Sequence, residues 1–217
     1  MEASTSGSGG GASWTPADPG PLGLAGFAMT TFVLSMYNSH LVSPVGTPVV
    51  LGLALAYGGI AQLLAGMWEF RTGNTFGAVA FTSFGAFWLS FWAINVFYAP
   101  LLVAGHAHSD IALYLYAWAI FTTYMWVASF RTSAAVNLVF FLLAITFFLL
   151  AIGNAGLNTS VIKAGGYVGL ATAIVAWYAS FAAVTNSTFG RTVLPVMPLS
   201  RPAGGGEVPV RGGAPAQ

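Results

Sequence analysis

Residues 134–152 read AAVNLVFFLLAITFFLLAI, a run of apolar side chains with two polar residues and no charge. A helix of about 20 mostly apolar residues spans the hydrocarbon core of a bilayer. Five other stretches have the same character, at residues 22–41, 45–68, 76–103, 111–130 and 165–184. We therefore predict an all-α, polytopic membrane protein with six transmembrane helices, because barrel strands show only short alternating segments.

The composition of the whole chain excludes a soluble fold. Of its 217 residues 57% are hydrophobic and only 5% are charged, and the mean hydropathy is +0.79. Soluble domains carry roughly 25% charged residues. No basic cluster indicates nucleic acid as a partner. The absence of cysteine excludes disulfides, thiol catalysis and Cys-based metal sites.

The two ends of the chain differ from its middle. Residues 1–20 and 196–217 are rich in Gly, Pro, Ala or Ser, and we expect both to be disordered tails. Residues 21–195 form the predicted six-helix transmembrane domain, so the lipid bilayer is a partner.

The basic residues orient the predicted helices. Lysine and arginine are enriched in cytoplasmic loops of membrane proteins. With the N-terminus inside, only Lys163 of the six basic residues falls outside. Both termini are therefore predicted to be cytoplasmic, and one external loop then holds His106, His108 and Asp110.

No Asp, Glu, Lys, Arg or His lies in the middle of a predicted helix, and Glu69 and His40 lie at predicted ends. Proton-driven carriers usually hold such groups within the membrane as relays. Catalysis needs an acid–base pair, and a metal site in a bundle needs inward His or carboxylate side chains. We therefore expect no enzyme, no metal and no cofactor.

Neutral polar groups remain as candidates for a substrate pathway. Gln62 lies in an apolar stretch and either lines a pore or makes an interhelical hydrogen bond. Thr30 either lines the pathway or bonds to its own helix. Pro19, Pro21 and Gly23 form a stiff lead-in to the first helix. A helix N-terminus at a pore mouth attracts carboxylates, although this segment also fits an ordinary helix start.

Several short motifs follow one another along the chain. They are PLGL at 21–24, GF at 26–27, MTT at 29–31, YGGIAQ at 57–62, GNTFG at 73–77, FTSFG at 81–85, FWL at 87–89, AIGN at 151–154 and FGRTVLP at 189–195. In this order they resemble the acetate uptake transporter family of the bacterial SatP (YaaH) type, over about residues 18–195.

The resemblance implies a six-helix protomer in a hexameric ring, with one path for acetate, and often succinate, through each protomer in the plasma membrane. It also implies a hydrophobic constriction, whose members by position are Phe27, Phe84 and Leu143. The family often has Tyr in place of Phe84 and Asn in place of Asp18. A helix rises about 1.5 Å per residue, and counting along each helix indicates that four side chains can meet at one depth of the bundle. They are the three constriction residues Phe27, Phe84 and Leu143, together with Gln62.

The function that we expect is a channel or transporter for small monocarboxylates, chiefly acetate. The first alternative is a channel for another small solute such as ammonium. The second is a membrane sensor that binds acetate without conducting it.

Overall fold

The computed structural model describes residues 14–102 and 106–199. In this part of the chain six helical stretches are long and apolar enough to cross a membrane, which confirms the predicted all-α polytopic fold. Four of these stretches contain one long helix each: α1 (Gly20–Asn38), α5 (Ala107–Ala128) followed by η5 (Ser129–Arg131), α6 (Ala134–Ala155) and α7 (Thr159–Phe189).

The other two stretches change their helical form along their length. The second consists of η1 (Pro44–Gly46), α2 (Val49–Leu55), the π-helical η2 (Ala56–Ala61) and α3 (Gln62–Thr72). The third consists of α4 (Thr75–Ala93), the π-helical η3 (Ile94–Tyr98) and η4 (Ala99–Leu101). Such π-helical turns inside α-helices occur frequently at functional sites.

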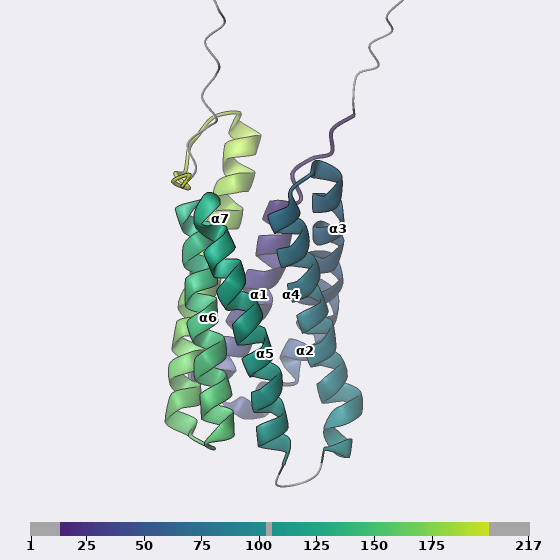
Figure 1. The fold of residues 1–217 in the computed structure, drawn as a ribbon, viewed down its shortest axis with the longest axis vertical. Coiled ribbons are helices and arrows are strands. Elements are labelled where there is room, and N and C mark those ends of the chain that lie inside the picture. The colour runs from purple at the N-terminus through teal and green to yellow at the C-terminus, as the bar shows by residue number, and fades with distance from the viewer. Residues whose placement is uncertain (1–13, 103–105, 200–217) are drawn as a thin grey trace, which may run out of the picture.

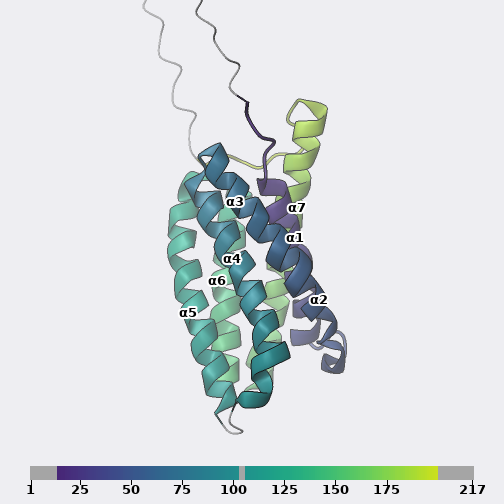
Figure 2. The ribbon, with the colours of Figure 1, turned by 90° about the vertical axis from the view of Figure 1, so that its right-hand side faces the viewer.

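The helices form one elongated bundle (Figure 1). α1 packs on α7, α7 on α6, α6 on α5, and α3 on α4. The first and last described residues lie at one end of the bundle, and the end of the third span and the start of α5 lie at the other (Figure 1). Figure 2 shows the second span running obliquely across α1 and α4. We call the end with the described chain ends the inner end and the opposite one the outer end.

Glycines permit the closest approaches between helices. A Cβ atom added at Gly26 would lie 2.6 Å from the carbonyl oxygen of Tyr57, and one added at Gly66 would collide with the backbone of Thr82. The backbones of neighbouring helices therefore touch at these points, as small residues permit in membrane bundles.

Several predicted boundaries were wrong. The sixth helix was expected at 165–184 but runs from Thr159 to Phe189. The Asn158 side chain caps its start by accepting from the backbone N–H groups of Ser160 and Val161. Left-handed Gly190, with φ of 62°, ends it. The first and last turns of this helix are too polar to be recognised as membrane-spanning from the sequence, but caps of this kind stabilise them.

The predicted external loop was wrong in part. His108 and Asp110 lie in the first turn of α5, which begins at Ala107, and not in a loop. An acidic residue in a first turn interacts favourably with the helix dipole. The fifth helix was expected to end at residue 152, but α6 continues to Ala155 and includes Asn154, whose side-chain amide donates to the Leu150 carbonyl.

The described part of the C-terminal segment packs on the bundle. Ala134 donates its backbone N–H to the Met197 carbonyl, and Leu199 donates to the Thr132 carbonyl, both at 2.8 Å. At the N-terminal end, residues 14–19 precede the first helix. The rest of the two predicted tails, residues 1–13 and 200–217, lies outside the described residues.

Candidate functional site

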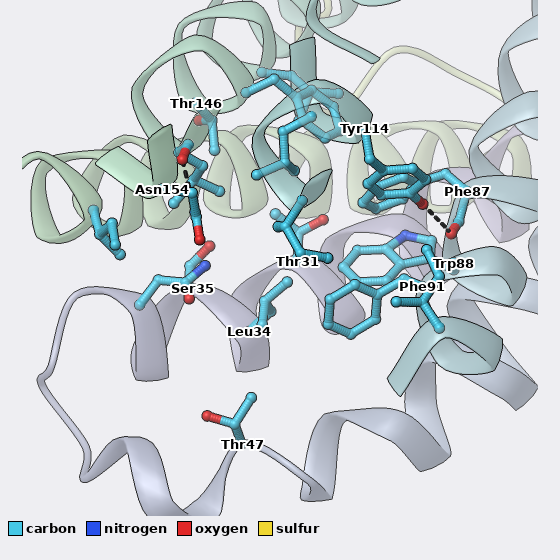
Figure 3. Close-up of a pocket in the computed structure, with 18 of the residues that line it drawn as sticks. Thr31, Leu34, Ser35, Thr47, Phe87, Trp88, Phe91, Tyr114, Thr146 and Asn154 are labelled. Atoms are coloured by element: carbon cyan, nitrogen blue, oxygen red, sulfur yellow. Dashed lines mark hydrogen bonds between the residues drawn. The ribbon is translucent and has the colours of Figure 1, made fainter. Parts of the chain in front are cut away.

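The outer half of the bundle encloses a cavity of about 360 Å³ between α1, the second span and α4 to α7 (Figure 3). Its wall is mostly aliphatic and aromatic, and no side chain that the structure describes there carries a charge. It is lined by Phe27, Thr31, Leu34, Ser35, Asn38, Thr47, Phe87, Trp88, Phe91, Ile94, Asn95, Ile111, Tyr114, Leu115, Leu143, Thr146, Phe147, Leu150, Asn154 and Ile162. Pockets for small molecules have this mixture of apolar wall and few polar groups.

Two of the three predicted constriction residues lie in the cavity wall. Phe27 and Leu143 line the cavity, and Phe84 packs behind them with its ring centroid 5.8 Å from that of Phe27. All three are buried, with exposed fractions of 5% or less, and belong to one hydrophobic cluster. Phe27 and Phe84 are thus in contact, and Leu143 belongs to the same cluster.

Gln62 and Thr30 are also buried but do not line the cavity. Thr30 donates its hydroxyl to the Gly26 carbonyl of its own helix at 2.9 Å. Gln62 begins α3 directly after the π-helical turn, and its side-chain carbonyl oxygen has no hydrogen-bond partner in the described chain. A Cβ atom added at Gly26 would lie 3.7 Å from the Gln62 Cβ, so Gln62 packs next to the Phe27 level.

The lead-in segment forms an ordinary helix start. Asp18 accepts the backbone N–H of Gly20 at 2.9 Å, and α1 begins at Gly20, directly after Pro19. Pro21 accepts the Ser180 hydroxyl of α7 at 2.7 Å. Gly23 provides room for the Phe81 ring, because a Cβ atom there would lie 2.6 Å from that ring. A carboxylate of the chain itself thus occupies the N-terminus of α1.

The inner end also contains a buried carboxylate. Glu69 is 2% exposed and accepts hydrogen bonds from the Asn74 amide at 2.9 Å and the Thr72 hydroxyl at 3.1 Å. Asn74 in turn caps α4 by accepting the backbone N–H of Gly77. The sequence placed Glu69 at a helix end, and the structure explains its burial, since the group joins the end of α3 to the start of α4.

Sequence reasoning missed most polar groups of the cavity wall. Asn38, Asn95 and Asn154 lie in its outer part, and Tyr114 donates to the Phe87 carbonyl at 3.1 Å, as Figure 3 shows. The Asn95 amide donates to the Phe91 carbonyl. A helix that is apolar on all sides gives no periodic signal of which face is inward.

The bundle and its cavity define a polytopic membrane protein with a solute-sized chamber lined mostly by aliphatic and aromatic side chains. The chain belongs to the GPR1/FUN34/yaaH family, whose sequence profile matches residues 12–201.

Named relatives come from bacteria and fungi. The succinate-acetate/proton symporter SatP of Escherichia coli K12 is 41% identical over 180 residues, which cover 83% of this chain and 95% of SatP. The ammonia transport outward protein 2 of Saccharomyces cerevisiae is 42% identical over 192 residues, which cover 86% of this chain and 67% of that protein. The fungal relatives are longer proteins, of which the matched segments span 62–69%.

A solved structure of the bacterial acetate channel SatP matches with a TM-score of 0.79 at 40% sequence identity. The match covers 84% of this chain and 99% of the SatP chain. The shared fold therefore includes all or nearly all of the SatP protomer.

Proposed function

We propose that this protein is a channel or transporter that moves small carboxylates, chiefly acetate and also succinate, across the plasma membrane. The observation that carries the proposal is the cavity of about 360 Å³, which is uncharged along its described wall and has in that wall Phe27, whose ring packs against that of Phe84. Relatives named for acetate or succinate transport support the substrate class.

The pathway runs from the outer cavity past Phe27, Phe84 and Leu143 to the inner end. Large apolar side chains at a narrow point hinder hydrated ions, because water is removed and nothing replaces its hydrogen bonds. Acetate suits such a point, since its methyl group is apolar and its charge is single. Pro19, Pro21 and Gly23 shape the inner mouth by setting where α1 begins and how closely it packs on α4.

Thr30 and Gln62 supply the polar side of this narrowing. The unpartnered carbonyl oxygen of Gln62 supports the assignment, since a buried polar atom without a partner is costly. The change Gln62→Leu keeps a similar volume and is expected to lower acetate flux severalfold with assembly intact. Flux equal to that of the wild type would make Gln62 a packing residue only.

We propose that both termini are cytoplasmic and that protomers assemble into hexamers. The charge asymmetry supports the orientation, because Arg71, Arg131 and Arg191 flank inner ends of helices, whereas Lys163 lies near the outer end. Exposed apolar side chains on most spans, such as Ile120, Ile174 and Phe181, support contact with lipid or neighbouring copies.

The test is uptake by proteoliposomes that contain only the purified protein. Radiolabelled acetate is expected to enter and to be competed by unlabelled acetate and succinate, and methylammonium is not expected to enter. Uptake of methylammonium without acetate would favour the ammonium channel. Acetate binding without any flux would favour the sensor.

A further inference from the structure

A groove of about 420 Å³ lies between the start of α1 and the last turns of α7, at the inner end of the bundle. Tyr57 of the second span also lies in its wall. The two helices pack against each other, and the Ser180 hydroxyl of α7 donates to the Pro21 carbonyl of α1 at 2.7 Å. Figure 2 shows the start of α1 beside the end of α7. The groove is therefore a notch between two helices that are held together.

The groove is on the opposite side of α1 from the transport cavity. Leu22 and Ala25 line the groove, whereas Phe27 and Leu34 line the cavity. At 3.6 residues per turn, these two pairs point to opposite sides of the helix. Leu22 is 45% exposed, and Val184 on the α7 side of the groove is 50% exposed. In a membrane this surface meets lipid or another protein, and not the solute in the cavity.

Polar and apolar side chains are separated along the groove. Asp18, Ser187 and Thr188 lie at its inner end, and Leu22 and Val184 lie about one helical turn nearer the middle of the bundle. A phospholipid has the same order, because its headgroup lies at the membrane surface and its acyl chains fill the hydrocarbon core. The groove thus matches one lipid whose headgroup lies beside Asp18.

The charge of the groove favours a cationic headgroup. Asp18 is the one charged side chain among the described residues that line it. A second carboxylate lies close by, since a Cβ atom added at Gly20 would lie 3.0 Å from the Asp18 Oδ1 and 3.4 Å from the Glu69 Oε1. The Arg71 guanidinium lies over the Trp14 ring instead, 5.8 Å from its centroid. Two carboxylates near one point attract an ammonium group and repel an anionic headgroup.

We propose that this groove binds one phosphatidylethanolamine molecule, with its ammonium group on Asp18 and an acyl chain between α1 and α7. An ethanolamine ammonium has three N–H donors, as a lysine ammonium does, and so can donate to the Asp18 carboxylate and to a hydroxyl of Ser187 or Thr188. The quaternary ammonium of a choline headgroup has no N–H to donate. The lipid binds here whatever solute the cavity carries.

The first test compares lipids with identical acyl chains by native mass spectrometry of the purified full-length protein. Phosphatidylethanolamine is expected to bind about tenfold more tightly than phosphatidylcholine or phosphatidylglycerol, as for one hydrogen bond to a charged group. Asp18→Asn is expected to remove this preference, while its side-chain oxygen still accepts the Gly20 N–H. Asp110→Asn, in the first turn of α5, is the control and is expected to keep the preference.

Equal binding of the three lipids by the wild type, or an unchanged preference in Asp18→Asn, overturns the ethanolamine site. A preference for phosphatidylglycerol overturns it as well, because it would mean that the headgroup meets a cationic surface.

The second test fills the apolar part of the groove. Ala183→Leu adds volume between α1 and α7 and is expected to lower the affinity for phosphatidylethanolamine about tenfold. Ala171→Leu is the control, because Ala171 is exposed on the same helix and does not line the groove. Equal affinities in the two variants contradict the proposed position of the acyl chain.

The same spectra report the number of subunits, which separates a lipid from a second copy of the chain. The lipid site predicts that Asp18→Asn and Ala183→Leu lose phosphatidylethanolamine and keep the wild-type number of subunits. If both variants change the number of subunits and the wild type shows no lipid preference, a second copy covers the groove and the lipid site is wrong.

Discussion

The Phe84 ring lies at the centre of an aromatic cluster that joins side chains of four helices. Five other rings have centroids within 5.4–6.4 Å of it, those of Phe27, Trp118, Phe121, Phe140 and Phe147. A tyrosine here would have to place its hydroxyl among these rings or turn it toward the cavity. Phenylalanine needs no partner, so the contact that this residue makes with its five neighbouring rings is wholly apolar in this chain.

Truncation at the narrowing is expected to broaden the substrates that pass. Leu143→Ala and Phe84→Ala are each predicted to raise the ratio of lactate to acetate flux, because the narrow point becomes wider. Both changes also remove core contacts, at a cost of about 2–5 kcal/mol. Side-by-side flux of the two acids in proteoliposomes measures the ratio separately from the amount of folded protein.

Leu138→Ala is the matched control for Leu143→Ala. Leu138 lies on the same helix but is 43% exposed, whereas Leu143 is 4% exposed. Its truncation is expected to leave the flux ratio at the wild-type value. If Leu143→Ala and Phe84→Ala also leave the ratio unchanged in folded protein, the selective narrowing lies elsewhere in the bundle.

Glu69 is a buried carboxylate that accepts hydrogen bonds, and its arrangement indicates a structural role. Glu69→Gln keeps an acceptor oxygen for Thr72 and Asn74, so we predict near-normal acetate uptake from this variant. The reason is that a proton can cross on the substrate as acetic acid, without a relay in the protein. Complete loss of uptake with normal expression would reveal an obligatory proton-carrying role for Glu69.

Whole helices are positioned by glycines at the contacts between α1, α7 and the oblique second span. A Cβ atom added at Gly166 of α7 would collide with the backbone of Ser39, just after the end of α1. Backbone atoms cannot rotate away as side chains do, so any larger residue must move one helix relative to the other. The width of the outer cavity depends on this spacing, since Asn38 and Ile162 both line it.

Alanine at Gly166 is therefore predicted to destabilise the protein by about 1–3 kcal/mol, the usual cost of overpacking. Gly52→Ala in α2 is the control, because nothing lies within 4 Å of a Cβ atom added there. That change is expected to stabilise the helix slightly, by up to about 1 kcal/mol. Thermal unfolding of the two variants in detergent measures the difference, and equal midpoints would contradict the tight contact.

The distribution of basic residues predicts which end of the whole molecule faces the cytoplasm. The native chain contains no cysteine, so single cysteines report on sidedness without background. We predict that Ser109→Cys, near the outer end, reacts with an impermeant thiol reagent added outside intact cells. Thr192→Cys, after the end of α7, is expected to react only when the membrane is opened. The reverse pattern would place both termini outside.

Sequence alone determined the number of spans, because bilayer thickness sets the helix length and lipid requires that the backbone be satisfied within each helix. These constraints act locally, so residues 134–152 identified a span without reference to any partner. Counting along helices also predicted one common depth for Phe27, Phe84 and Leu143, and the first two are in contact.

Only the three-dimensional structure showed where each helix ends and which polar side chains face the cavity. The caps by Asn158 and Gly190 lengthened α7 beyond its apolar part. Trp88 and Trp126 are the same residue type in equally apolar helices, yet only Trp88 lines the cavity. Helices that are apolar all round have no preferred face of their own. Close packing between helices, at contacts such as Gly26 with Tyr57, sets which face turns inward.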